Sequence, residues 1–145
     1  GEATGGMHGA DRIGGLSSAN GIVFGRIAGA SAALAAQKEP EAALKADITL
    51  PQYGIATTDA ERLTHSLRHT MSTYCMINRT ETGLSEALHE LEGLKTEATT
   101  LSTQKAQDSE VAALARLQSQ IQLAQEMVKA MRKRTESLGS HYRAD

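Results

Sequence analysis

The chain has 145 residues, a formal net charge of −2, one cysteine and no tryptophan, and aromatic residues make up 3% of it. This charge gives no basic surface for nucleic acid, and the single cysteine excludes an internal disulfide and fits a reducing compartment. With so few aromatic residues, a core must be built from leucine, isoleucine, methionine and alanine, which favours helices. We therefore expect a mainly α-helical protein that is large enough for a modest core.

The first 15 residues are dense in glycine and lead into a predicted helix. Five glycines allow the backbone to approach a flat or anionic ligand closely: Gly5, Gly6, Gly9, Gly14 and Gly15. A helix that follows such a loop points free N–H groups and the positive end of its dipole toward that ligand. The run is not the dinucleotide motif G-x-G-x-x-G and belongs to no βαβ unit, so it predicts a different kind of site.

The helix after this loop is predicted to run from about residue 17 to residue 36. Three polar residues at its start are candidate N-caps: Ser17, Ser18 and Asn20. Small residues recur on one face and allow close packing against another element: Gly21, Gly25 and Gly29. A run of about 20 residues also has the length of a membrane span. Arg26 near its centre and its alanine- and glycine-rich composition argue against that alternative.

Residues 38–56 form a predicted linker. Two prolines and a glycine interrupt regular structure in it: Pro40, Pro51 and Gly54. Within the linker, residues 48–50 have the composition of a brief extended segment. The linker separates a first segment, residues 1–37, from a C-terminal domain, residues 57–145.

The C-terminal domain is predicted to hold three amphipathic helices, each with apolar residues at helical spacing. Their apolar faces are, in chain order, Leu63, Leu67, Met71 and Tyr74; then Leu84, Leu88, Leu91, Leu94, Ala98 and Leu101; then Leu114, Leu117, Ile121, Ala124, Val128 and Met131. Cys75 has apolar neighbours and is interpreted as a core residue. Three such helices with short connections predict an antiparallel bundle.

Polar residues mark the expected ends of these helices. The candidate N-caps are Thr58 in a capping box with Glu61, then Thr80, then Asp108 or Ser109. Gly139 is expected to end the third helix. This leaves a tail with His141, Tyr142 and Arg143, and solvent is the default expectation for the side chains of His141 and Arg143.

Two histidines, His65 and His69, stand four residues apart on the first of the three helices. Metal pairs use this spacing, but no third ligand stands at a fitting distance, and the motif is not H-E-x-x-H. We therefore expect no metal site.

The order of the parts in the first 30 residues resembles the flavin-proximal segment of the flavoprotein subunits of succinate dehydrogenase and fumarate reductase. The chain has GE at 1–2, HGADRIGG at 8–15 and VFGRIAG at 23–29, where that family has GE, HGANRLGGNSL and VFGR-x-AG. The runs NRTETGLSEALHEL and RKRTESLGSHYRAD resemble the family's RTEELLQEGLEKL and RKESRGAHYRED. The chain departs from the pattern at Asp11, Leu16, Ser18 and Leu138.

The resemblance implies FAD as cofactor and hydride transfer between the flavin and a small dicarboxylate. The residues that it assigns to FAD are Glu2, at a ribityl hydroxyl, and Gly14, Gly15, Ser17 and Ser18, near the flavin ring. It makes Arg12 the catalytic residue that holds a substrate carboxylate, which the two-point geometry of arginine suits, and places His8 near the substrate. Plainer interpretations are that Arg12 pairs with Asp11 or a surface acid and that His8 bonds a backbone carbonyl.

The resemblance also makes this chain the C-terminal part of a flavoprotein, because the family's Rossmann-like FAD site and capping domain would lie upstream of Gly1. The expected partners are the remaining N-terminal part of the flavoprotein, an iron–sulfur subunit and the dicarboxylate substrate, with no nucleic acid and no direct membrane insertion. The expected localisation is cytoplasmic, at the membrane face through partner subunits. The chain alone is expected to be an inactive fragment that does not bind FAD tightly.

Two other functions stay open. One is L-aspartate oxidase, a close relative, although residues 12–15 resemble the succinate and fumarate pattern better. The other is a non-catalytic helical interaction module, which would dock a partner through the bundle and would not need the glycine loop.

Overall fold

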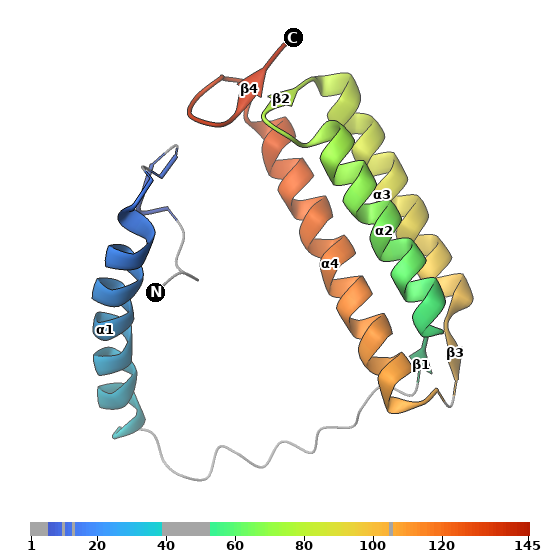
Figure 1. Cartoon of the computed structure of the whole chain (residues 1–145), viewed down its shortest axis with the longest axis horizontal. Coiled ribbons are helices and arrows are strands. Elements are labelled where there is room, and N and C mark those ends of the chain that lie inside the picture. Colours follow the sequence, from blue (N-terminus) through green and yellow to red (C-terminus); the bar gives the residue numbers. More distant parts are fainter. Residues whose placement is uncertain (1–5, 10, 13, 39–52, 105) are drawn as a thin grey trace. The chain divides into compact units, whose positions relative to one another are not determined.

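The structure is a computed structural model that describes residues 6–9, 11–12, 14–38, 53–104 and 106–145. The described residues form four helices and a few two-residue strands, which confirms the predicted mainly α-helical class. The chain divides into two compact units, Gly1–Thr49 and Leu50–Asp145 (Figure 1).

The first unit contains the helix α1 (Leu16–Ala36), which ends where the sequence predicts. Its N-cap is Gly15, and no side chain caps the first turn. The prediction that Ser17, Ser18 or Asn20 caps the helix is therefore wrong, because all three residues lie inside it. No side chain of α1 is buried, and its large apolar residues are exposed: Leu16, Ile22, Val23, Phe24, Ile27 and Leu34.

By length and composition alone, α1 could cross a membrane, and no other helix in the described part of the chain meets that test. A helix in the core of a soluble protein also meets it, so this observation is weak evidence for a span. The exposed apolar side chains of α1 require either lipid or additional polypeptide to cover them.

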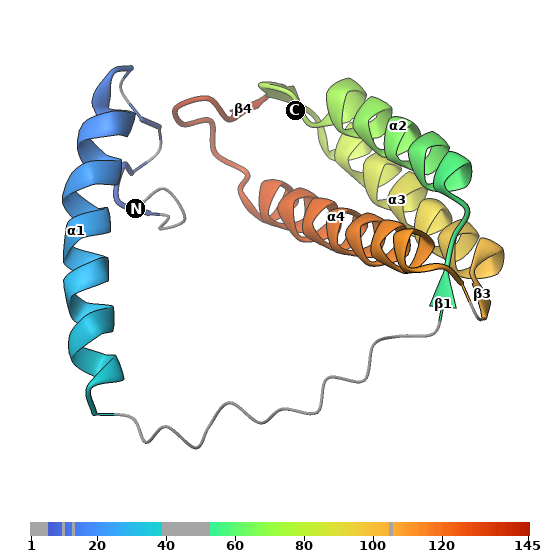
Figure 2. The same ribbon diagram turned by 60° about the horizontal axis from the view of Figure 1, so that its bottom comes forward.

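The second unit is a bundle of three helices, α2 (Thr57–Tyr74), α3 (Glu81–Leu101) and α4 (Asp108–Lys133). They lie side by side in Figures 1 and 2, with α3 running opposite to α2 and α4. The predicted antiparallel three-helix bundle is therefore present. Because the chain runs up, down and up, α2 and α4 are parallel neighbours.

The core of the bundle draws on all three helices. Every residue of the predicted apolar faces is either buried or packed against the buried cluster. Cys75 is 7% exposed and belongs to this cluster, as expected. Ile55 and Ala87 are core residues that the helical spacing did not predict, and both are fully buried.

A pair of two-residue strands lies at each end of the bundle (Figure 1). At one end β1 (Tyr53–Gly54) pairs antiparallel with β3 (Thr103–Gln104). At the other end β2 (Asn78–Arg79) pairs parallel with β4 (Tyr142–Arg143). The second pair fixes the C-terminal tail beside the turn between α2 and α3.

The bundle begins earlier in the chain than the sequence predicts. The Ile55 N–H donates to the carbonyl of Glu110 over 3.2 Å, and the Ile55 side chain is buried. Residues 53–55, assigned to the linker from the sequence, thus pack as part of the bundle. The predicted extended segment at 48–50 lies outside the described residues.

The N-cap of α3 is the one that the sequence predicts. Thr80 Oγ1 accepts the N–H of Gly83 over 3.1 Å, which satisfies one of the free donors of the first turn. The capping box predicted for α2 is wrong, because its N-cap is Ala56 and Thr58 lies inside the helix.

The caps predicted for α4 are also wrong. Asp108 and Ser109 are its first two residues, and the N-cap is Gln107. The Gln107 N–H donates to Glu110 Oε2 over 2.9 Å, so glutamine and glutamate form the capping box here. The carboxylate of Glu110 also lies favourably at the positive end of the helix dipole.

Gly139 does not end α4, which stops six residues earlier at Lys133. Instead Gly139, with a φ of 61°, makes the tight turn between Leu138 and His141. The backbones of Leu138 and His141 exchange two hydrogen bonds, of 2.9 and 3.2 Å. The tail is therefore a hairpin that returns to the bundle.

Candidate functional site

Four of the predicted cofactor residues lie at the turn that starts α1: Gly14, Gly15, Ser17 and Ser18. Gly15 adopts a left-handed φ of 88°, which favours glycine, and a Cβ added to Gly14 or Gly15 would meet no atom within 4 Å. The first turn of α1, with exposed Ser17 and Ser18, has neither a side-chain cap nor an acidic residue. Its N–H groups are thus available to an electron-rich ligand that approaches this turn.

Arg12 lies exposed in the loop before this turn. Its backbone N–H donates to Asp11 Oδ1 over 2.8 Å. Within the described residues, however, the Arg12 guanidinium forms no ion pair with Asp11. Arg12 thus contacts Asp11 through its backbone N–H and not through its side chain. The Arg12 side chain can therefore serve an external carboxylate.

His8 is half-buried and is held against α1. Asn20 Nδ2 lies 2.7 Å from His8 Nε2 and also contacts the sulfur of Met7. Among the residues that the structure describes, the His8 ring contacts a side-chain amide rather than the backbone carbonyl of the plainer interpretation. Because an amide nitrogen can only donate, His8 Nε2 is the acceptor in this contact. Glu2 lies outside the described residues.

These observations provide a test of whether the turn suits FAD. A flavin ring has electron-rich oxygens and nitrogens at one edge, and uncapped helix N–H groups are matched donors for them. The open space over Gly14 and Gly15 allows a planar ring to come close. The described residues of this turn therefore fit the group that the resemblance implies.

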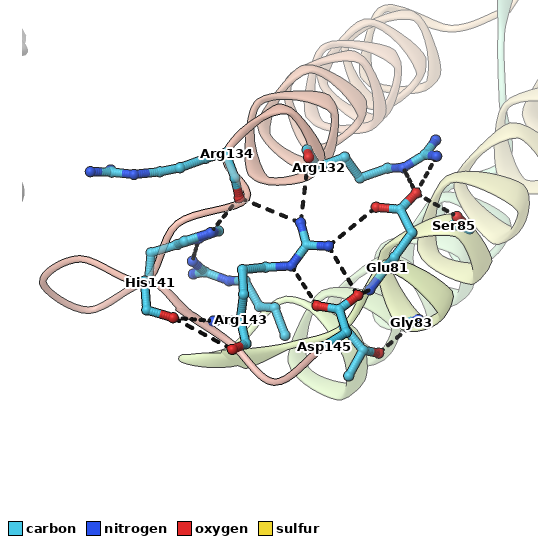
Figure 3. A network of polar contacts seen from close by, with 11 residues as sticks. Glu81, Gly83, Ser85, Arg132, Arg134, His141, Arg143 and Asp145 are labelled. Atoms are coloured by element: carbon cyan, nitrogen blue, oxygen red, sulfur yellow. Dashed lines mark hydrogen bonds and ion pairs between the residues drawn. The ribbon is translucent and has the colours of Figure 1, made fainter.

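A second concentration of charge lies in the bundle unit, and we call it the tail cluster: Arg79, Glu81, Arg132, His141, Arg143 and Asp145. Figure 3 shows how its labelled members converge where the tail meets the first turn of α3 and the last turn of α4. The Arg143 side chain is only 6% exposed. It donates to Asp145 over 2.9 and 3.1 Å, to Glu81 over 3.4 Å, and to the carbonyls of Arg132 and Arg134.

Each carboxylate of the tail cluster has several donors. Asp145 Oδ2 accepts the backbone N–H of Glu81 over 2.6 Å, and Arg132 Nε donates to Glu81 Oε1 over 2.7 Å. The hydrogen bond with Arg143 lowers the pKa of Asp145, and that with Arg132 lowers the pKa of Glu81. Asp145 in turn raises the pKa of the Arg143 guanidinium.

His141 is the buried polar residue of the cluster, at 6% exposure. Its Nε2 donates to the carbonyl of Arg134 over 2.9 Å, because a carbonyl can only accept, and its Nδ1 accepts from the Arg79 guanidinium. The expectation that His141 and Arg143 lie in solvent is therefore wrong. Both side chains instead hold the tail to the bundle.

The tail cluster has a structural role rather than a catalytic one. Within the described residues, its charged side chains pair with one another and with backbone groups of the tail and the helix ends. Sequence reasoning missed the cluster because its two halves, residues 79–81 and 141–145, are about 60 residues apart. The signal in the sequence was a pair of opposite charges in the tail, Arg143 and Asp145, together with an acidic residue in the first turn of α3, Glu81.

The histidine pair forms no metal centre with its neighbours. His65 and His69 are both exposed on α2. Among the residues that the structure describes, no three histidine, cysteine or acidic side chains are grouped closely enough to hold an ion.

The bundle is the fold to be expected of a helical C-terminal module, and the class of flavoprotein rests on sequence similarity. A comparison with protein-family models supports this class, since residues 64–145 match the model described as fumarate reductase flavoprotein C-term. The match covers more than half of the chain, and the chain belongs to this family of flavoprotein oxidoreductases.

One relative extends the similarity over the whole chain. It is an uncharacterised FAD-dependent oxidoreductase of Methanocaldococcus jannaschii, 32% identical over 151 residues, an alignment that covers 100% of this chain. The chain spans 28% of the length of that relative. No solved structure matches the chain.

Proposed function

We propose that this chain is the C-terminal part of an FAD-dependent oxidoreductase of the succinate dehydrogenase and fumarate reductase type. The reaction is hydride transfer between flavin and a small dicarboxylate. One observation carries the proposal: an uncapped helix N-terminus follows two glycines with open space above them, and an arginine without an acidic side-chain partner in the described residues precedes them. The family match and the FAD-dependent relative support the same class.

In this proposal the N–H groups of the first turn of α1 and the hydroxyls of Ser17 and Ser18 hold the pyrimidine edge of FAD. Gly14 and Gly15 keep the approach free of side chains. Glu2 accepts a ribityl hydroxyl. When bound, FAD supplies the hydride acceptor or donor of the reaction, and the positive end of the α1 dipole stabilises negative charge on the ring.

Arg12 is proposed to hold one carboxylate of the substrate. Its guanidinium stays charged at any physiological pH and offers two parallel N–H donors, so it fixes both the position and the orientation of a carboxylate. His8 lies in the same loop, and its bond with Asn20 ties that loop to α1. This contact fixes the position of the proposed substrate loop relative to α1, the helix that is proposed to face the flavin.

The proposed partners are the N-terminal part of the flavoprotein and an iron–sulfur subunit, at the cytoplasmic face of a membrane. We propose that α1 is covered by the flavoprotein and does not insert into lipid. The charge of Arg26 at the middle of α1 supports this, because an arginine at the centre of a bilayer is costly.

The test is Arg12→Lys in the full-length flavoprotein. Lysine keeps the charge but loses the two-point geometry, and losing one charge-assisted bond costs about 1.5–3 kcal/mol, or roughly 10- to 150-fold in turnover. Steady-state kinetics with succinate and fumarate should show this loss, while FAD content and melting temperature stay unchanged. The matched control is Arg62→Lys, an exposed arginine of α2 that already pairs with Glu97.

Activity within twofold of the parent would contradict the substrate role of Arg12. Loss of FAD at unchanged intrinsic turnover would move Arg12 to the cofactor residues. Turnover of L-aspartate in place of succinate and fumarate, in the parent enzyme, would favour L-aspartate oxidase.

A further inference from the structure

Two adjoining hollows lie between the parallel helices α2 and α4, on a different part of the bundle from the tail cluster, and we call the two together the groove. Its first half, of about 460 Å³, is lined in part by His65, Arg68, Arg116 and Gln120. Its second half, of about 190 Å³, is lined in part by Met71, Leu123 and Met127. Arg68 and Gln120 line both halves, so one groove changes from cationic to apolar along its length.

The first half of the groove carries an excess of positive charge. Arg68 and Arg116 come from facing helices, both are exposed, and one carboxylate, Glu61, shares the lining with them. Within the described part of the chain, neither arginine forms an ion pair, whereas Arg62 and Arg132 both do. Two arginines that the bundle leaves without an acid are suited to carboxylates from outside it.

The same part of the groove contains a polar atom without a partner. Gln120 Oε1 is buried and accepts no hydrogen bond from the described residues. Buried acceptors in folded proteins nearly always have a donor. An N–H group seated in the groove would supply one.

The second half of the groove is apolar and open to solvent. Leu123 is 62% exposed and Met127 is 43% exposed, and they stand one helical turn apart on α4. Met71 of α2 lines the same half. Methionine adapts its shape to apolar partners, so such a groove is suited to the apolar side of a docked segment.

We propose that this groove binds an acidic segment with adjacent apolar side chains, from the part of the flavoprotein that lies outside these 145 residues. The inference rests on the proposed function. A polypeptide meets all three requirements, with carboxylates for Arg68 and Arg116, an N–H donor for Gln120, and apolar side chains for Leu123 and Met127. A small anion meets only the first. The chain covers 28% of its relative, so proteins of this kind have ample further polypeptide to supply the segment.

The experiment measures maleimide labelling of cysteines that are introduced one at a time, in the 145-residue chain and in the full-length FAD-loaded flavoprotein. Cys75 is buried and gives a slow background in the C-terminal region. Leu123→Cys places a thiol in the groove, and Ser119→Cys places one on an exposed position of α4 outside it. Labelling of Leu123→Cys should be at least about tenfold slower in the flavoprotein, as a docked segment with a tenfold excess of the closed state requires. Labelling of Ser119→Cys should not change.

A second variant tests the charge requirement. Arg116→Glu, combined with Leu123→Cys, should restore fast labelling in the flavoprotein, because the acidic segment is then repelled. The control Lys133→Glu makes the same charge change at an exposed position of α4 outside the groove and should leave the protection intact.

Equal labelling of Leu123→Cys in the two proteins, or equal slowing at position 119, overturns the docking proposal. Protection that appears only when succinate or inorganic phosphate is added would show a small-anion site and also overturns it. FAD content and dicarboxylate turnover, measured on the same preparations, report separately on the proposed function, so each can fail without the other.

Discussion

The two units of the chain differ most in what they bury. The bundle encloses a cluster of fully buried side chains from all three of its helices, whereas α1 buries none of its own. A bundle that closes its core can fold by itself, while an isolated apolar helix in water is marginal and needs other polypeptide. In keeping with the proposed function, we expect Leu50–Asp145 to fold as an autonomous module and Gly1–Thr49 to depend on further polypeptide.

The proposed chemistry lies in the dependent unit. Arg12, Gly14, Gly15 and the first turn of α1 all belong to it, and the bundle contributes no candidate cofactor residue. Stability and function are thus assigned to different parts of the chain. Substitutions in the two units should therefore have different effects on stability and on flavin binding.

The largest expected effect concerns flavin itself. The 145-residue chain should purify without flavin, because the site for the adenine and pyrophosphate lies outside it in the proposed enzyme, whereas the full-length flavoprotein should carry FAD. Absorbance of the supernatant after denaturation measures both. A yellow preparation of the chain alone, with stoichiometric flavin, would contradict the dependence of the first unit on other polypeptide.

The next largest effect is expected from placing a charge in the core, which should lower the stability of the bundle but not that of α1. Ile121, 1% exposed, lies in the core, and Ile121→Asp should lower the free energy of unfolding by roughly 3–5 kcal/mol. The matched change Ile27→Asp, at a residue of α1 that is 54% exposed, should move it by less than about 0.5 kcal/mol in the isolated chain. Urea denaturation followed by circular dichroism measures both. Similar losses for the two variants would mean that α1 shares the cooperative core.

The two units also differ in the room that they leave for a side chain at a glycine. A Cβ on Gly54 would lie 2.4 Å from the Cβ of Ala106 and 2.7 Å from the backbone of Glu110. Gly54→Ala should therefore destabilise the bundle by about 1–3 kcal/mol, as overpacking does. Gly25→Ala in α1 meets no atom within 4 Å and should raise the helicity of the isolated chain, since alanine favours a helix by roughly 1 kcal/mol. An unchanged urea midpoint for Gly54→Ala would show that β1 can move away from α4.

Helix caps give a smaller effect with an internal control. Thr80→Ala removes the acceptor for the Gly83 N–H and should cost about 1 kcal/mol of bundle stability. Thr58→Ala, at the position that the sequence predicted as a cap, should cost much less, because Thr58 caps nothing in the structure. Thermal melts of the two variants distinguish them. A larger loss of stability for Thr58→Ala than for Thr80→Ala would show that Thr58 caps α2, as the sequence predicted.

The sequence predicted the features of the fold that depend on local periodicity. Apolar residues at helical spacing, such as Leu114, Leu117 and Ile121, identified the bundle and its core, because the side of a helix that faces the core follows from its period. Periodicity says nothing about single buried residues outside helices, so Ile55 was assigned to the linker. The N-cap of α4 was predicted from the residue types that are commonest at that position, such as aspartate and serine. Glutamine is not among them, so Gln107 was not predicted.

Two further features were beyond sequence reasoning for different reasons. The tail cluster depends on pairing between β2 and β4, and contacts between segments so far apart follow from packing rather than from composition. The roles of Arg12, Ser17 and Ser18 depend on groups outside the chain. They could be inferred from the resemblance, and the structure adds only that their turn is open and uncapped.

The smallest expected effect is a dependence on pH at the tail. The pKa of Asp145 lies below its ordinary value of 3.8, because its carboxylate accepts from Arg143 and from the Glu81 N–H. A carboxyl group with a lower pKa in the folded state binds fewer protons there than in the unfolded chain. The stability that it adds is therefore complete above 3.8 and declines as the pH falls through lower values. The effect is small because the Asp145 and Glu81 side chains are 37% and 45% exposed, so solvent screens the ion pairs.

Asp145→Asn isolates this contribution, because it keeps the size of the side chain and removes its charge. Parent and variant should differ in urea midpoint at neutral pH, and the gap should close as the pH is lowered from about 5 toward 2, since the parent then loses the same charge by protonation. Asp11→Asn makes the same change in the first unit and should give no gap in the unfolding of the bundle at any pH. A gap for Asp145→Asn that persists at low pH would mean that the tail is held by the shape of the carboxylate rather than by its charge. In that case the strand pair of β2 and β4, and not Arg143, would be what fastens the tail to the bundle.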